Sequence, residues 1–316
     1  MKKILCLILT ILTLVSLTAC GGENVGSEKI QIITSLFPHY DFARQIVGDK
    51  AEVTLLLKPG MESHTYDPST ADIYKITSAD LFIYTGKDME AWVEKVIASI
   101  DKNGPTIVDA TREIELLHSE HHEGDNADDH DHVYDPHIWL NPLNAAQMLD
   151  TILEAICKID PDNESFYREN AKKYKDEILL LDSDIERTIN EAKISSDVDT
   201  LVFGGKFAYA YFFDRYDLDY VSAYKTCSTE TEPSLTTIYQ ISQYIKDNGI
   251  PCVFKEELSE GKVAKSIAEI SGATVQTFST AHNVSKEDFD RGETYVSIMY
   301  QNLNVIRRAL VDTQIQ

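Results

Sequence analysis

Short apolar runs rich in β-branched and aromatic residues alternate along the chain with longer stretches of helical periodicity. The runs predict four strands in each half of the chain, near residues 31–34, 52–57, 81–84, 106–108, 201–203, 220–223, 252–254 and 274–277. Most of these runs are continuously apolar, which is typical of strands that are covered on both faces. Strands separated by helices therefore indicate an α/β protein with two mostly parallel sheets, each flanked by helices.

A long amphipathic stretch separates the two groups of strands. Pro161 stands near its start, and apolar residues then recur at spacings of three and four: Tyr167, Ala171, Tyr174, Ile178, Leu181, Ile185 and Ile189. A helix of about 30 residues would reach about 45 Å. We therefore expect residues 161–193 to form a helix that connects an N-terminal lobe, residues 30–160, to a C-terminal lobe, residues 194–316. The alternative is an ordinary surface helix, which the periodicity alone does not exclude.

The N-terminus has the features of an export signal. A short basic start precedes a charge-free run over residues 4–19, which is shorter than the about 20 residues of a spanning helix. Residues 1–19 are therefore interpreted as a signal peptide. The residues around Cys20, LTACGG, resemble a bacterial lipobox, in which cleavage leaves the cysteine as a lipidated N-terminus. Residues 20–29 would then be a lipidated tether on the extracytoplasmic face of the cell membrane; the alternative is a secreted protein with an incidental cysteine.

Charge and cysteine content exclude several classes of protein. The chain carries 29 Lys and Arg against 52 Asp and Glu, a net charge of -23, and loss of residues 1–19 removes two lysines and no acid. Such acidity argues against binding to nucleic acid and against a basic membrane-binding patch. After Cys20 only Cys157, Cys227 and Cys252 remain, too few for a disulfide framework. One pair, such as Cys227 with Cys252, would still be able to form a bridge outside the cytoplasm.

Histidines carry the candidate chemistry, and six of the nine lie between residues 118 and 137. Residues 118–132 read HSEHHEGDNADDHDH, have no apolar periodicity and predict a mobile loop. We expect this loop to be a low-affinity accessory collector of metal; the alternative is a solvated linker that binds metal adventitiously. Its histidines are His118, His121, His122, His130 and His132.

Two further histidines stand in rigid loop frames. His64 lies in PGMESHTYDPS, just after the second expected strand, at the sheet edge where α/β proteins bind ligands. His137 lies in DPHIWLNP, between two prolines. Neutral imidazole is a good ligand for zinc and other transition metals, and a rigid frame lowers the ordering cost of binding. Both are candidate metal ligands, whereas His39, in FPHY, is expected to have a structural or supporting role.

These two segments, with a lipobox before them and a His-rich insert between them, resemble the zinc/manganese solute-binding lipoproteins of ABC-type metal importers, a metal-binding protein A family of zinc-uptake type. The resemblance covers the whole chain. It implies two lobes joined by one long helix, a metal site in the interlobe cleft and two ligands from each lobe. It also implies that the protein captures Zn²⁺, delivers it to an ABC permease with its ATPase, and is not an enzyme. We expect a monomer.

The second lobe departs from the family pattern. The position at which family members usually place a His or Glu holds Lys206, and an ammonium group has no lone pair to donate. His282, beyond the last expected strand, is therefore the expected third ligand. For the fourth, Cys227 is the first candidate because a thiolate suits zinc, although it could equally be a disulfide or a buried thiol. Glu256, Glu230 or a water are the alternatives.

Three imidazoles favour zinc over manganese, which is expected to recruit more carboxylate oxygen. Mn²⁺, or another divalent metal, remains the alternative cargo. A metallohydrolase would need a general base beside the metal, and the chain has no HExxH, GxSxG or Walker motif. A surface adhesin is the other open alternative, because relatives of the resembled family have been described in that role.

Overall fold

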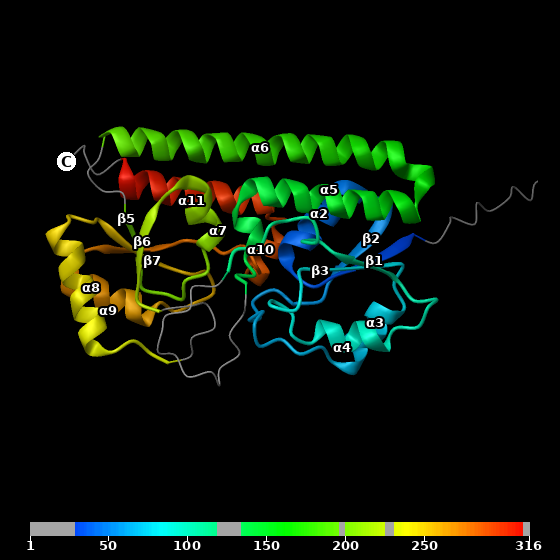
Figure 1. Ribbon diagram of the computed structural model, residues 1–316, viewed down its shortest axis with the longest axis horizontal. Helices are drawn as coiled ribbons and strands as arrows, with labels where there is room; N and C mark the ends of the chain where they lie inside the picture. Colours follow the sequence, from blue (N-terminus) through cyan, green and yellow to red (C-terminus); the bar gives the residue numbers. More distant parts are fainter. Residues whose placement is uncertain (1–28, 119–133, 196–199, 225–230, 312–316) are drawn as a thin grey trace, which may run out of the picture.

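The computed structural model describes residues 29–118, 134–195, 200–224 and 231–311 (Figure 1). The strands in these ranges are β1 (Ile30–Thr34), β2 (Ala51–Leu55), β3 (Leu81–Tyr84), β4 (Thr106–Asp109), β5 (Thr200–Phe203), β6 (Asp219–Ser222), β7 (Cys252–Lys255) and β8 (Thr274–Thr277). The helices are α2 (Phe37–Val47), α3 (Thr70–Thr77), α4 (Val93–Ser99), α5 (Pro142–Ile159), α6 (Glu164–Ser195), α7 (Ala210–Tyr216), α8 (Leu235–Asp247), α9 (Lys262–Ser271), α10 (Lys286–Asp290) and α11 (Tyr295–Leu310). Short 3₁₀ turns, η1 (Ile138–Leu140) and η2 (Pro161–Asn163), precede α5 and α6. The two-lobed α/β fold predicted from the sequence is confirmed.

The two halves repeat one topology. The strand orders are β2-β1-β3-β4 and β6-β5-β7-β8, and every pair is parallel. In each sheet the order reverses beside the first strand, β1 or β5. Connections on either side of such a reversal leave the carboxyl edge of the sheet in opposite directions, which opens a crevice there for ligands.

Helices cover both faces of each sheet. Because successive side chains of a strand point to opposite sides, each strand contributes residues to both covered faces. Leu81 and Ile83 enter the core that contains α2 and α5, whereas Phe82 packs with α3 and α4. In the second sheet Phe203 faces α7 and α11, and Val202 faces α8 and α9. This burial on both faces explains why the strands are continuously apolar in the sequence.

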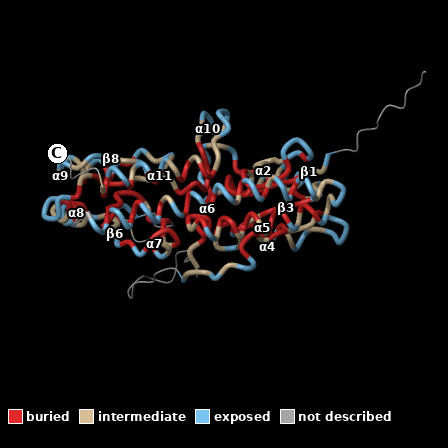
Figure 2. The backbone as a smooth tube through the Cα atoms, turned by 90° about the horizontal axis from the view of Figure 1, so that it is seen from above, coloured by how far each residue is buried: buried red, intermediate tan, exposed pale blue. Residues whose placement is uncertain are grey.

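Helix α6 runs along both lobes (Figures 1 and 2). The apolar stripe from Tyr167 to Ile189 is buried, with no member more than 4% exposed. It packs against α2 and α5 of the first lobe and against α11 of the second. The inner faces of both sheets and the stripe of α6 belong to one continuous apolar core. The helix therefore braces the two lobes against each other as well as connecting them.

Several sequence predictions concern residues outside the described ranges. They are the signal peptide, Cys20 and nearly all of its tether, His121, His122, His130 and His132 of the His-rich loop, Cys227 and Glu230. Within the described part of the chain, Cys157 and Cys252 are buried free thiols. No helix in that part is long and apolar enough to cross a bilayer.

Candidate metal centre

The three predicted histidine ligands come from three different loops. His64 lies between β2 and α3, His137 immediately precedes η1, and His282 lies between β8 and α10. The ring centroids of His64 and His137 are 5.4 Å apart, and those of His64 and His282 are 6.4 Å apart. The structure thus brings all three imidazoles together where the carboxyl edges of the two sheets meet.

The ring separations can be compared with those around a zinc ion. Zinc lies about 2.0–2.1 Å from an imidazole nitrogen, so two rings on one tetrahedral ion have centroids about 5 Å apart. The pair His64–His137 is near that value, and the pair His64–His282 is about 1 Å wider. Consistently, no three His, Cys, Asp or Glu groups within the described ranges already stand in metal-binding geometry. A bound ion would need to bring the rings of His64 and His282 about 1 Å closer together.

His137 is held from its Nδ1 side by Asp135. The Asp135 Oδ1 atom lies 2.8 Å from the backbone nitrogen of His137 and 3.0 Å from its Nδ1. The imidazole is 1% exposed, and the Trp139 ring packs against it edge-on at 5.7 Å. The Nδ1 side is therefore occupied, and the Nε2 side is left for a ligand.

His282 is held in the same way by two partners. Thr280 Oγ1 contacts His282 Nδ1 and lies 2.6 Å from Glu257 Oε1. The backbone nitrogen of Thr280 donates to the other carboxylate oxygen of Glu257 at 2.7 Å. Glu257 Oε1 itself lies 3.4 Å from His282 Nδ1. Sequence reasoning missed Asp135 and Glu257: Asp135 was visible two residues before His137, but no local signal connects Glu257 to His282.

The loop that carries His282, residues 279–284 (the His282 loop), is bonded to the first lobe. Asn283 Nδ2 donates to the carbonyls of Lys58 at 2.9 Å and Met61 at 2.7 Å, in the segment that leads to His64. The backbone nitrogen of Gly60 donates to the Val284 carbonyl at 2.8 Å. The His282 and His64 loops are therefore joined directly.

The beginning of the same loop is bonded to both lobes. Trp139 Nε1 donates to the Thr280 carbonyl at 2.7 Å, and this bond is buried. Asn302 of α11 receives the Ser279 N–H at 2.7 Å and donates to the Ser279 carbonyl at 2.8 Å. Between these anchors Ala281 adopts a left-handed φ of 56°, which a residue other than glycine rarely does. As predicted, the last strand, β8, ends at Thr277, and this anchored loop follows it and carries His282.

Glu256 lies at the carboxyl edge of the second sheet. Its Oε2 atom is buried and has no hydrogen-bond partner among the described residues. Burial raises the pKa of this carboxyl group, against the opposing effect of hydrogen bonds from the backbone and from Ser259. Gly205 admits the carboxylate, because a Cβ at that position would overlap Oε2. Lys206 follows Gly205 directly, at the position where members of the resembled family usually have a His or Glu.

His39 lies in a separate buried network of the first lobe. Its ring nitrogens face Ser35 Oγ at 3.4 Å and Thr85 Oγ1 at 3.2 Å. Burial lowers the pKa of His39 to about 3 and raises the pKa of Glu90 to about 7. Glu90 receives the Ser35 hydroxyl at 2.5 Å and the Gly86 N–H at 3.0 Å. His39 is thus a neutral core residue.

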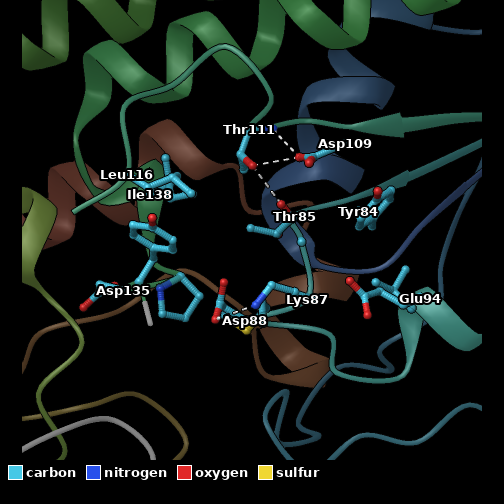
Figure 3. A pocket seen from close by; sticks show the side chains of 15 residues that line it. Tyr84, Thr85, Lys87, Asp88, Glu94, Asp109, Thr111, Leu116, Asp135 and Ile138 are labelled. Atoms are coloured by element: carbon cyan, nitrogen blue, oxygen red, sulfur yellow. Dashed lines mark hydrogen bonds and ion pairs between the residues drawn. The ribbon is translucent and has the colours of Figure 1, made fainter. Parts of the chain in front are cut away.

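A pocket of about 280 Å³ is lined in part by Asp135 and Ile138, which flank the His137 position in the sequence (Figure 3). It lies between the ends of β3 and β4 on one side and residues 134–138 on the other. Thr111 bonds to Asp109 and to the Thr85 carbonyl in its wall. Asp135, whose carboxylate contacts His137 Nδ1, is also one of the residues that line this pocket.

His118 is the one histidine of the His-rich loop that the structure describes. It is exposed and pairs with Tyr134 in an isolated antiparallel bridge, with ring centroids 4.6 Å apart. The adjacent Leu117 N–H donates to the hydroxyl of Tyr211 in the second lobe at 2.9 Å. The two ends of the His-rich segment therefore meet beside the interlobe boundary.

Known proteins of similar sequence include two bacterial zinc proteins. The chain is 32% identical to the high-affinity zinc uptake system protein ZnuA of Bacillus subtilis over 303 residues, 93% of each chain. It is 31% identical to the zinc-binding lipoprotein AdcA of Streptococcus pneumoniae over 312 residues, which are 98% of this chain but 61% of AdcA. The chain thus spans about three fifths of the length of that streptococcal relative.

Comparison of the fold with solved structures agrees with the sequence comparison. The crystal structure of the Zn(II)-bound ZnuA-like domain of Streptococcus pneumoniae AdcA matches with a TM-score of 0.75 and 28% identity, covering 90% of this chain and 99% of that domain. Residues 32–309 match the family model described as "Zinc-uptake complex component A periplasmic". Since that match extends over most of the chain, the protein belongs to the zinc-uptake complex component A family.

Proposed function

We propose that this chain is the extracytoplasmic zinc-binding component of an ABC importer, and that His64, His137 and His282 bind Zn²⁺ as its cargo. The observation that carries the proposal is the convergence of three imidazoles from three loops, with ring centroids 5.4 and 6.4 Å apart. The relatives named for zinc uptake and zinc binding support the same cargo.

The donor set favours zinc over manganese. Imidazole nitrogen suits zinc, whereas manganese prefers carboxylate, carbonyl and water oxygens. The carboxylates of Asp135 and Glu257 lie on the Nδ1 sides of His137 and His282 and accept from N–H and O–H donors. They therefore act on the imidazoles and leave a nitrogen-rich site.

Glu256 is our first choice for the fourth ligand. Its Oε2 is a buried oxygen without a hydrogen-bond partner in the described part of the chain, which is costly unless something fills its place. Carboxylate oxygen binds zinc at about 2.0–2.2 Å. Cys227 and Glu230, which lie outside the described residues, and a water are the alternatives. Lys206 is excluded as a ligand by its chemistry, because a protonated amine has no lone pair.

The remaining parts of the proposal concern location and partners. Lipidation of Cys20 would hold the protein at the outer face of the membrane, with several acyl chains giving a firm anchor. A monomer would then deliver zinc to an ABC permease driven by its ATPase. Replacing Cys20 with Ala should release the protein from membranes into the soluble fraction, and retention of the variant on washed membranes would contradict the anchor.

Metal binding is tested by competition titration with a chromophoric zinc chelator and by anomalous diffraction at the zinc edge. Single alanine variants of His64, His137 and His282 should each lower zinc affinity by at least about tenfold, which is about 1.4 kcal/mol. His118→Ala is the matched control and should leave the tight site unchanged. An anomalous peak away from these three imidazoles would overturn the assignment. For transport, a strain lacking the protein should grow poorly under zinc limitation when no other importer is present.

A further inference from the structure

We infer that Asp135 and the Thr280–Glu257 pair are positioning residues that fix His137 and His282 as Nδ1–H tautomers and so reserve both Nε2 atoms for the metal. The consequence for metal binding rests on the proposed function. The tautomers themselves belong to the metal-free chain and can be measured without zinc.

Asp135 determines the tautomer of His137. Its Oδ1 accepts from the backbone N–H of His137 at 2.8 Å and lies 3.0 Å from Nδ1 of the same residue. An ionised carboxylate offers only lone pairs. The Nδ1 atom must therefore carry the proton, and the Nε2 atom keeps its lone pair.

Thr280 determines the tautomer of His282, and Glu257 determines the orientation of Thr280. A hydroxyl group has a single proton to donate. Thr280 Oγ1 lies 2.6 Å from Glu257 Oε1, a distance at which one of the two oxygens must supply a proton. The carboxylate supplies none, so the hydroxyl proton points to Glu257. Towards His282 Nδ1 the hydroxyl oxygen is left as an acceptor, and Nδ1 must be the donor.

The Glu257 carboxylate is itself fixed. Its Oε2 accepts from the backbone N–H of Thr280 at 2.7 Å, so both of its oxygens are bound to one residue. The opposite arrangement, with the hydroxyl proton on His282, would leave two acceptor oxygens 2.6 Å apart. The chain thus uses an Asp on one side of the site and a Glu acting through a Thr on the other to reach the same tautomer. Such partners of metal-bound histidines typically contribute 10- to 100-fold in affinity.

The test is ¹⁵N NMR of histidine side chains in the metal-free full chain, at a pH where the imidazoles are neutral, combined with zinc competition titrations. The wild type should show Nδ1–H signals for both His137 and His282. Thr280→Val should mix the tautomers of His282 alone and lower zinc affinity by about 10- to 100-fold. Asp135→Ala should do the same to His137 alone. Thr280→Ser, which keeps the hydroxyl, should restore both the wild-type tautomer and the affinity.

Glu257→Ala gives a second prediction, in which the tautomer of His282 is reversed rather than mixed. It frees the hydroxyl proton of Thr280 to point at Nδ1, so His282 should shift towards the Nε2–H form. This variant keeps the inference testable if Thr280→Val does not fold. Glu260→Gln is the matched control. Glu260 is an exposed acid in the loop between β7 and α9 that also carries Glu257, and its substitution should change neither the tautomers nor the zinc affinity.

The outcomes separate the inference from the proposed function. An Nε2–H form of either His137 or His282 in the wild type overturns the inference, as does a loss of affinity in Thr280→Val without a change of tautomer. Nδ1–H tautomers together with no tight zinc site in the wild type would support the positioning role and refute the proposed function.

Discussion

Asn283 offers the sharpest test of whether the anchored His282 loop shapes the metal site. Asn283→Asp keeps the shape of the side chain and its acceptor for the Val284 N–H at 2.8 Å. It replaces the two donated bonds, to Lys58 O at 2.9 Å and Met61 O at 2.7 Å, with contacts between oxygens. Asn283 is completely buried. An acceptor that loses its donor costs about 1–3 kcal/mol when it is shielded from water, so loss of both bonds should lower the free energy of unfolding by about 2–6 kcal/mol.

The substitution should also weaken zinc binding. If the His282 loop is released from the His64 loop, only the fraction of molecules with the loop in place can bind, and the apparent dissociation constant rises by the inverse of that fraction. A cost of 2 kcal/mol that falls entirely on the loop weakens binding by roughly 30-fold. Urea unfolding followed by tryptophan fluorescence measures the first quantity, and zinc competition titration in the same buffer measures the second.

Asn170→Asp is the matched control. Asn170 Nδ2 donates to the Ile46 carbonyl at 3.2 Å and joins α6 to α2, elsewhere in the first lobe. It should lower the free energy of unfolding and leave zinc affinity unchanged. The reasoning is refuted if Asn283→Asp loses stability in the expected range but binds zinc as tightly as the wild type.

Three further outcomes are expected. Because the pKa of Glu90 is raised from 4.5 to about 7, the folded protein keeps a proton that the unfolded chain releases, and the contribution of Glu90 to the free energy of unfolding should fall as pH rises from about 4.5 to about 7. The free energies of unfolding of the wild type and of Glu90→Gln can be compared by urea titration between pH 5 and 8. The difference between them should change by on the order of 3 kcal/mol over this range. A difference that does not depend on pH would contradict the prediction. Gly205→Ala should displace the Glu256 carboxylate and, if that group is the fourth ligand, weaken zinc binding by about tenfold or more in a competition titration; full affinity would remove Glu256 from the site. Deletion of residues 118–132 should leave one tight zinc site by calorimetry while removing any weaker ones, and loss of the tight site would show that the loop is part of it.

Most of the fold could be predicted because its signals are local. Apolar runs of strand length predict each of the eight strands in the described ranges, and the three–four spacing of Tyr167 to Ile189 predicts the long helix. The error at β2 is instructive. The apolar character of Leu56 and Leu57 predicts that the strand includes them, and both residues are indeed buried. The strand nevertheless ends at Leu55, where the chain turns towards the His64 loop.

The site was predictable only in part. His64 and His137 are framed by neighbouring prolines, so their role could be inferred from short segments. The role of Glu257 depends on a hydrogen bond to Thr280 across 23 residues, and that of Asn283 on bonds to Lys58 and Met61 across more than 220 residues. Such contacts have no periodicity and no fixed spacing. They become visible only when the topology places the ends of different strands at one edge.

The unbroken core beneath α6 bears on how the molecule folds and how it can be divided. Tyr174 and Ile185 belong to one apolar cluster together with Phe42 of the first lobe and Leu303 of the second. A gene fragment that stops before the long helix would leave Phe42 and its neighbours facing water, and one that starts after it would do the same to Leu303. Neither half should be a self-sufficient domain, and heat should melt the whole protein in a single step.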